Sequence, residues 1–281
     1  MKIATTGWDG RIGRTLVNAG CVPLDCDITD PFQLKQAVKK VKPDIIINCA
    51  ALTRVDLAET DTDAFLEVNS YAVRHLLDTK LKVIQISTDY IFDGHRGPYS
   101  EDNPFMDELD GEILEPVNAY GWSKSGPETL AAANVYPNLY IVRTTGVYTD
   151  DWEQWDFLKM VVATLLDGDR VRASGELHGN QTFSGHFVEG LLYAIQHDKL
   201  PKVLHIASRE VISRYEFALM IAEKFGLDNR LILTCSNNDV PGWVAKRPTK
   251  GGLDVSLAES LGIPVYSIQE GLDECLKTYP S

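Results

Sequence analysis

The sequence predicts an α/β fold in which a doubly wound parallel sheet is joined by a smaller α/β lobe. Through the first half of the chain, short apolar runs alternate with helical segments, which is the pattern of parallel βαβ units. The first run, 2–6, breaks directly into the glycine-rich turn 7–13, GWDGRIG. Beyond about residue 148 the alternation loosens. We therefore expect a Rossmann-like dinucleotide-binding domain at 1–148 and mainly a substrate-binding lobe at 149–281, with some segments of the lobe returning to the sheet.

Each element has its own local signal. Runs rich in Ile and Val predict strands, and Asp30 followed by Pro31 predicts a capped helix start. Capping boxes at 213–216 and 267–270 open two late helices. The expected strands are 2–6, 21–25, 44–48, 82–87 and 139–143. The expected helices are 11–19, 30–41, 61–78, one beginning near 120, 151–166, 186–196 and the two late ones, with a long acidic loop at 93–117.

Composition narrows the classes of partner. A net charge of -13 argues against nucleic acid and against an anionic membrane as partners. We expect no membrane span and no signal peptide, because no apolar run is long enough and Lys2 leads straight into the first strand. The five cysteines are scattered without metal-ligand spacing, so we expect no metal site and a reducing, cytoplasmic location.

The turn 7–13 has the features of a dinucleotide site. Gly7, Gly10 and Gly13 permit a tight turn, let backbone N–H groups approach a pyrophosphate, and let helix pack closely on strand. The spacing is GxxGxxG and thus differs from the commoner GxGxxG. Its position directly after an N-terminal strand favours the dinucleotide interpretation over a purely steric one.

Two further groups suggest proton transfer. Tyr120 and Lys124 lie four residues apart, on one side of a helix, and a nearby ammonium favours the phenolate. We therefore expect Lys124 to lower the pKa of Tyr120 toward a catalytically useful range. Ser87 and Thr88 follow the fourth strand at its carboxyl end, where ligands of open α/β sheets bind. Either these hydroxyls meet a substrate carbonyl, or they only satisfy the strand end.

The glycine turn, the hydroxyls at 87–88 and the pair of Tyr120 and Lys124 follow one another in this order along the chain. With this order, the chain resembles the extended short-chain dehydrogenase/reductases, and most of all the dTDP-4-dehydrorhamnose reductase family. The resemblance covers nearly the whole chain. The matching segments are 6–13, 27–31, 42–51, 53–59, 68–69, 87–94, 120–124 with 128, 142–144, 213–217, and 247–248 with 253–254 and 256.

The resemblance implies NAD(P)H-dependent reduction of a nucleotide-linked 4-keto-6-deoxy sugar. Tyr120 would protonate the sugar oxygen, Thr88 would hydrogen-bond it, and Lys124 would hold the nicotinamide ribose. These three would be the catalytic residues. The implied cofactor residues are Gly7, Gly10, Arg11, Ile12, Gly13, Asp27, Ile28, Ala50, Ala51, Thr53, Asn69, Ser87 and Lys124; the implied substrate residues are Thr88, Tyr90, Tyr120, Thr182 and Arg247. The oligomeric state stays open, a homodimer among the alternatives.

The choice of cofactor depends on few residues. Asp25 follows the short second strand, where an acidic residue binds the ribose 2′-hydroxyl of NADH. Arg11 and Arg14 lie where a 2′-phosphate could be met, on a chain that is otherwise strongly acidic. We expect NADPH, with NADH as the alternative.

Several segments depart from the family pattern and bear on the substrate. Gly146 stands where the family has a Trp, and 177–182 lacks the family's Gln and Pro. The acidic insertion 106–115 could cover the cleft, and Trp152 and Trp155 either stack on a ligand or belong to the core. Two other functions therefore stay open: a nucleotide-sugar epimerase or dehydratase that retains NAD, and a non-catalytic dinucleotide-binding module like the regulatory subunit of methionine adenosyltransferase.

Overall fold

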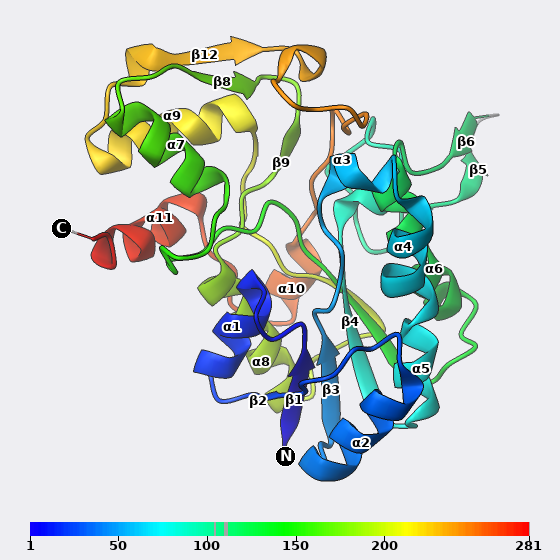
Figure 1. The fold of residues 1–281 in the computed structure, drawn as a ribbon. Coiled ribbons are helices and arrows are strands. Elements are labelled where there is room, and N and C mark those ends of the chain that lie inside the picture. The colour runs from blue at the N-terminus through cyan, green and yellow to red at the C-terminus, as the bar shows by residue number, and fades with distance from the viewer. Residues whose placement is uncertain (104, 110–111, 281) are drawn as a thin grey trace. The chain divides into compact units, whose positions relative to one another are not determined.

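The computed structural model describes residues 1–103, 105–109 and 112–280, which fold into two compact units (Figure 1). The first unit comprises Met1–Asp93, Pro104–Arg143 and Leu200–Leu204. The second comprises Gly94–Asn103, Thr144–Lys199 and His205–Ser281. The division of roles at residue 148 stays a prediction.

The first unit is organised on a six-stranded sheet with the strand order β10-β7-β4-β3-β1-β2. The pairings from β2 to β7 are parallel, which confirms the predicted doubly wound α/β fold. The strands are β1 (Ile3–Thr6), β2 (Val22–Pro23), β3 (Ile45–Asn48), β4 (Lys82–Ser87), β7 (Leu139–Arg143) and β10 (Val203–His205).

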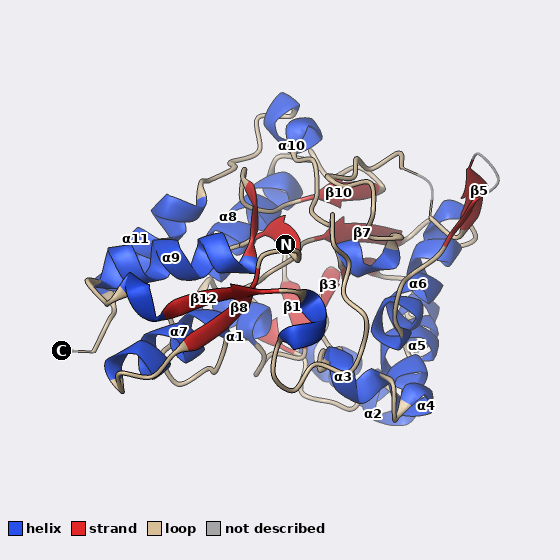
Figure 2. Ribbon diagram, turned by 90° about the horizontal axis from the view of Figure 1, so that it is seen from above, coloured by secondary structure: helices blue, strands red, loops and turns tan. Residues whose placement is uncertain are grey.

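Helices of the first unit cover the sheet on opposite faces. The chain moves in one direction from β1 to β2 and in the other from β2 onward, so right-handed crossovers place α1 (Arg11–Asn18) opposite α2 (Pro31–Val41), α5 (Val73–Asp78) and α6 (Ala119–Ala132). Figures 1 and 2 show α2, α5 and α6 together on one side. A buried core on that side joins Ala4, Ile46 and Val83 of the strands to Leu34 and Leu76 of the helices.

The helix predicted at 61–78 is interrupted. It consists of α4 (Thr62–Leu66), the π-helical turn η1 (Glu67–Tyr71) and α5, with the short α3 (Val55–Ala58) before them. The widened turn carries Asn69, whose side chain is buried and bonded to the backbone of Leu52. Such π-turns are frequent at functional sites. The prediction that a helix covers roughly 61–78 is thus borne out, but the π-helical turn within it was not predicted, because apolar periodicity does not report a single inserted residue.

The second unit contains two small sheets and most of the later helices. β8 (Val171–Ser174) pairs in parallel with β12 (Ile232–Cys235), and β9 (His178–Asn180) pairs antiparallel with β11 (Val211–Ser213). The helices are α7 (Phe157–Leu166), α8 (Ser184–Gln196), α9 (Arg214–Phe225), α10 (Ser256–Ser260) and α11 (Ile268–Lys277). Short 3-10 turns lie at Asp89–Ile91 (η2, in the first unit), Asn229–Leu231 (η3) and Asn237–Asp239 (η4).

The helix starts predicted from capping signals are confirmed. Asp30 caps α2, and both predicted capping boxes form, at Ser213 with Glu216 and at Ser267 with Glu270. The helix predicted from residue 151 begins only at Phe157, because Asp156 accepts the Lys159 N–H as its cap.

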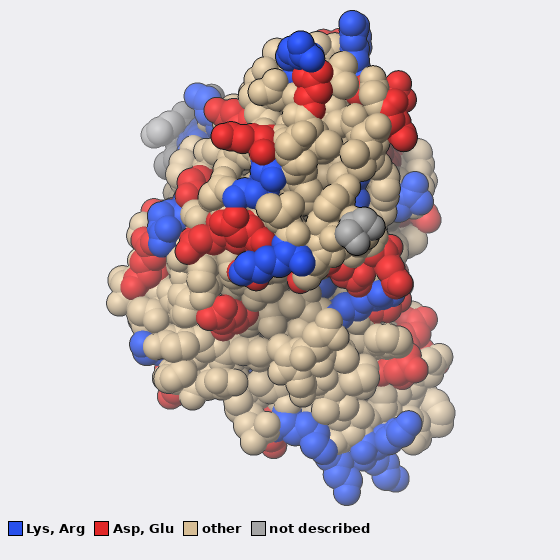
Figure 3. All heavy atoms as spheres, turned by 90° about the vertical axis from the view of Figure 1, so that its left-hand side faces the viewer, with Lys and Arg blue, Asp and Glu red and all other residues tan. Residues whose placement is uncertain are grey.

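The loop predicted at 93–117 contains a strand pair, β5 (Asp107–Leu109) with β6 (Glu112–Leu114). The prediction of a long acidic loop did not include this strand pair. Residues 110–111 of the acidic insertion 106–115 lie outside the described residues, so its proposed role over the cleft stays a prediction. Within the described ranges, no helix has both the length and the apolar character needed to cross a membrane. On the face drawn in Figure 3, acidic and basic side chains are interspersed over the upper part, and a group of basic side chains lies at the lower end.

Candidate active site

The glycine turn connects β1 to α1 in close contact with the end of β3. Gly7 has φ +55°, and a Cβ on it would lie 2.7 Å from the backbone nitrogen of Ala50. A Cβ on Gly13 would lie 2.1 Å from the Gly7 carbonyl oxygen. Gly10 is the N-cap of α1 and no acidic residue occupies the first helical turn. The turn therefore needs glycine at 7 and 13, and it presents the positive end of a helix dipole.

The other predicted cofactor residues lie around this turn at the ends of β2 and β3. Ile28 is buried, whereas Asp27 is exposed and accepts hydrogen bonds from the backbone and hydroxyl of Thr29. Ala50 and Ala51 follow β3 directly and are half-buried, and Thr53 is exposed. Ile12 lies in the first turn of α1.

Ser87 ends β4 with a hydroxyl that lacks a hydrogen-bond partner. Its Oγ is fully buried, and a buried hydroxyl without a partner costs roughly 1–3 kcal/mol. A ligand group at the carboxyl end of the sheet would supply that partner. Ser87 thus fits a cofactor or substrate contact better than the alternative of a satisfied strand end.

The Tyr120 helix is held very close to the segment after β4. Asn118 caps α6 by accepting the Gly121 N–H at 2.8 Å. A Cβ on Gly121 would lie 2.2 Å from the carbonyl oxygen of Tyr90, so only glycine allows this approach. The Tyr90 and Tyr120 rings meet edge to face, with centroids 5.7 Å apart. Thr88 is buried at the start of this segment, and its hydroxyl accepts the Tyr90 N–H at 3.3 Å. The predicted residues Thr88, Tyr90 and Tyr120 are therefore brought together.

The pKa of Tyr120 runs opposite to the prediction. Burial raises the pKa of the phenol well above its usual range, and the charges of Tyr90 and Asp89 raise it further. A hydrogen bond with Thr88 and the charge of Arg11 act in the lowering direction and are outweighed. The expected lowering of the Tyr120 pKa was wrong in its net direction, because the nearly complete burial of Tyr120 outweighs the favourable charges.

Lys124 lies one helical turn further on and is also buried. Its Nζ donates to the carbonyl oxygen of Ile86 at 2.7 Å. Burial lowers the pKa of this ammonium to about 8, while the charges of Glu128 and Cys49 oppose the change. Lys124 thus remains mostly protonated at neutral pH, with one N–H directed to the main chain.

Two buried contacts on α6 were not predicted from the sequence. Asn69 Nδ2 donates to the hydroxyl of Ser123 at 2.9 Å and to the carbonyl oxygen of Leu52, and Asn69 Oδ1 accepts the Leu52 N–H. These hydrogen bonds connect the loop after β3 to the Tyr120 helix. Arg143 of β7 donates to Glu128 from Nε at 2.9 Å and from Nη2 at 2.8 Å. Asn69 thus positions the loop through side-chain hydrogen bonds. Spacing along the sequence contains no signal for pairs this far apart.

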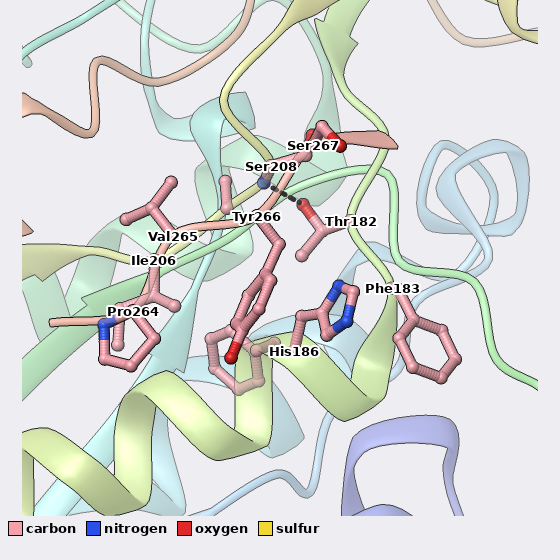
Figure 4. A pocket seen from close by; sticks show the side chains of 11 residues that line it. Thr182, Phe183, His186, Ile206, Ser208, Pro264, Val265, Tyr266 and Ser267 are labelled. Carbon is pink, nitrogen blue, oxygen red and sulfur yellow. Dashed lines mark hydrogen bonds between the residues drawn. The ribbon is translucent and has the colours of Figure 1, made fainter. Parts of the chain in front are cut away.

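Thr182 and Arg247, the remaining predicted substrate residues, belong to the second unit. Thr182 lines a small cavity of about 10 Å³ and accepts the Ser208 N–H at 3.3 Å (Figure 4). Arg247 donates to the carbonyl oxygen of Ala245 at 2.8 Å, and its guanidinium lies 4.5 Å from the ring centroid of Trp243.

One departure from the family pattern, Gly146 in the second unit, has a local explanation. Gly146 has φ +61°, and a Cβ there would lie 2.3 Å from the Asn180 carbonyl oxygen, so the backbone leaves no room for a Trp. Trp152 packs edge to face on Tyr279, with centroids 4.8 Å apart. Both residues pack against the apolar core of the second unit, which includes Val161 and Phe217. Trp155 is 66% exposed.

The family is established by comparison with known sequences. The family profile described as "RmlD substrate binding domain" matches residues 1–281. The chain belongs to this family. The dTDP-4-dehydrorhamnose reductase of Mycolicibacterium smegmatis is 30% identical over 290 residues, which cover 98% of this chain and 85% of that protein. That of Aggregatibacter actinomycetemcomitans is 27% identical over 96% of this chain and 97% of the relative.

A solved structure agrees with the same assignment. The dTDP-4-dehydrorhamnose reductase of Bacillus anthracis, in complex with NADP, has a TM-score of 0.85 and 26% identity, with 99% of this chain and 100% of that chain covered. The predicted resemblance to the dTDP-4-dehydrorhamnose reductase family of extended short-chain dehydrogenase/reductases is thereby confirmed.

Proposed function

We propose that this member of the dTDP-4-dehydrorhamnose reductase family is an NAD(P)H-dependent reductase that converts the 4-keto group of a dTDP-linked 6-deoxy sugar to a hydroxyl. The observation that carries the proposal is the buried phenol of Tyr120 beside Thr88, one helical turn from Lys124. Relatives across nearly the whole chain carry the name of this reductase. Thr182 and Arg247 are proposed as further contacts of the sugar nucleotide.

The raised pKa of Tyr120 suits the reductive direction. Reduction of a ketone requires a proton on the carbonyl oxygen, and a phenol with a raised pKa is fully protonated at neutral pH. Tyr120 then delivers its proton, and the Thr88 hydroxyl orients the acceptor oxygen. The ammonium of Lys124 stabilises the phenolate that remains, because an opposite charge nearby favours the ionised form.

The residues of the first unit fit a nicotinamide dinucleotide. The turn at Gly7 and Gly13 has no space for side chains and opens on the N-terminus of α1, which suits a pyrophosphate. The unpartnered Ser87 hydroxyl lies at the carboxyl end of β4. When bound, the nicotinamide supplies the hydride. The protein would hold the dinucleotide at this turn and at the ends of β2, β3 and β4.

NADPH is proposed as the preferred cofactor. Arg14 donates from Nε to the carbonyl oxygen of Asp9, and Trp8 donates from its indole nitrogen to Asp25 at 3.3 Å. Asp25 is thus engaged within the protein, and Arg14 beside the turn favours a 2′-phosphate. The charge of Arg11 acts also on Tyr120, in the direction that lowers its pKa.

These surroundings separate the two arginines experimentally. Arg14→Gln should weaken NADPH binding by at least tenfold more than NADH binding, since it removes a partner of the 2′-phosphate. Arg11→Gln, the matched control, should weaken both cofactors alike. Equal effects of Arg14→Gln on the two cofactors, measured by fluorescence titration, would refute the assignment.

The function itself is tested by steady-state turnover. Purified protein with NADPH and dTDP-4-dehydrorhamnose should consume one NADPH per sugar reduced, and no cofactor should remain bound after purification. Tightly retained NAD without net NADPH consumption would favour an epimerase or dehydratase. Cofactor binding without turnover of any nucleotide 4-keto sugar would favour a non-catalytic binding module.

A further inference from the structure

Three polar side chains lie side by side at the carboxyl end of the sheet, directly beneath the site. The strand register places Thr6 opposite Asn48 and Asn48 opposite Gln85. Because side chains alternate along strands, these three lie on the same face as the core residues Ala4 and Ile46. All three are at most 1% exposed. We refer to Thr6, Asn48 and Gln85 as the polar ladder.

Hydrogen bonds run through the ladder in a single direction. The Thr6 hydroxyl donates to Asn48 Oδ1 at 2.5 Å, and Asn48 Nδ2 donates to Gln85 Oε1 at 2.6 Å. Gln85 Nε2 then donates to the carbonyl oxygen of Ile86 at 2.9 Å. Each amide uses its oxygen on one side and its nitrogen on the other, so the orientation of every group depends on its neighbour.

The ladder ends on the atom that receives Lys124. The Ile86 carbonyl oxygen accepts from Lys124 Nζ at 2.7 Å as well as from Gln85. The last β3–β4 register pair is Asn48 with Gln85, so Ile86 lies one residue beyond it. At its other end the ladder reaches the segment after β3, because the Thr6 hydroxyl accepts the Ala50 N–H at 3.4 Å. Thr6 is also the residue directly before the glycine turn.

A buried polar network of this kind is costly unless every member is satisfied. An apolar residue at 48 or 85 would extend the core seen at Ile46 and Val83 and need no partner. Stability alone therefore does not require the ladder. Its position between the glycine turn and the Lys124 ammonium gives it a role in the site.

We propose that Asn48 and Gln85 are positioning residues, which fix the acceptor of the Lys124 ammonium and connect it to the cofactor turn. The proposal rests on the proposed function, in which Lys124 serves the proton-transfer step. Gln85 and Lys124 both donate to one oxygen, so the positive end of the Gln85 amide faces the ammonium and disfavours its charge.

The direct readout is the titration of Lys124, followed by NMR of protein labelled at the lysine ε-carbon and assigned by the loss of its signal in Lys124→Met. Gln85→Met removes the donor that competes at Ile86 and should raise the titration midpoint by about half a pH unit or more. The other titratable groups whose charges act on Lys124, Glu128 on α6 and Cys49 after β3, are unchanged in this variant.

Asn48→Leu provides a second variant, should Gln85→Met fail to fold. It deprives Gln85 of its partner and should move the Lys124 midpoint in the same direction. Asn138→Leu is the matched control, since Asn138 donates to the carbonyls of Leu77 and Leu81 at the other end of β4. It should reduce stability and leave the Lys124 midpoint unchanged.

The measurement requires no turnover, so it is independent of whether the reductase function holds. A Lys124 midpoint unaltered in Gln85→Met or in Asn48→Leu, or an equal change in Asn138→Leu, would overturn the positioning role. Where the reductase is active, kcat should also fall about tenfold in Gln85→Met with little change in the KM of the sugar.

Discussion

Gly121 provides a demanding test of how the site is assembled. Its Cα faces the carbonyl oxygen of Tyr90, and an alanine Cβ would lie 2.2 Å from that oxygen and 2.7 Å from Pro116 Cβ. Cβ contacts under 3.0 Å essentially do not occur, so α6 and the Tyr90 segment must separate by at least about 0.8 Å. Gly121→Ala therefore moves Tyr120 relative to Thr88 by almost an ångström.

Gly121→Ala should affect the catalytic rate more strongly than the stability of the fold. A misplacement near 1 Å costs about 100-fold in rate, so kcat/KM should fall by roughly that factor. Overpacking costs about 1–3 kcal/mol, but alanine gains about 1 kcal/mol over glycine within a helix. The free energy of unfolding should therefore fall by no more than about 2 kcal/mol.

NADPH-consumption kinetics and urea unfolding measure the two quantities on the same preparation. Gly190→Ala in α8 is the matched control, since its Cβ would find its nearest atoms at 3.2 Å, and kcat/KM should stay within about threefold. If Gly121→Ala retained wild-type kcat/KM, the tight contact between α6 and the Tyr90 segment would not set the catalytic geometry.

Two further predictions concern the buried charges on α6. Glu128→Gln leaves Arg143 buried without its carboxylate partner, so the free energy of unfolding measured in urea should fall by about 3–5 kcal/mol. Glu259→Gln, the control, breaks an exposed ion pair with Arg209 and should cost under about 1 kcal/mol. Equal losses in the two variants would show that burial of the pair is unimportant. Lys124 has a folded pKa of about 8, below the ordinary value of 10.5, so the unfolded state binds more protons between these values and the stability contributed by this site rises with pH. The stability advantage of Lys124→Met over wild type should accordingly shrink by up to about 1.4 kcal/mol per pH unit from pH 8 to 10, and a constant difference would contradict the lowered pKa.

Much of the fold could be predicted because its signals are local. The Ile run of β3, the cap at Asp30 and the capping box at Ser213 each depend on a few adjacent residues, and each formed as predicted. The π-helical turn at Asn69 was missed because one inserted residue hardly alters the apolar pattern.

The site residues divide in the same way, into those with a local sequence motif and those whose contacts appear only in the folded structure. Tyr120, Thr88 and the glycine turn could be proposed as site residues from motifs, but the direction of the Tyr120 pKa shift depends on burial that only the folded structure reveals. The polar ladder joins three strands through residues about 40 positions apart, and no spacing rule links them. From the sequence, Gly146 is the loss of the Trp that the family has at this position. In the structure, its positive φ shows that the backbone at this position favours glycine.

The central claim is that Tyr120 donates the proton during reduction. Tyr120→Phe removes only the phenolic hydroxyl and keeps the ring that packs against Tyr90. Single-turnover reduction of dTDP-4-dehydrorhamnose by bound NADPH should slow at least about 100-fold, with the dissociation constant of NADPH within about twofold of wild type. A single-turnover rate in Tyr120→Phe close to that of wild type would contradict the claim.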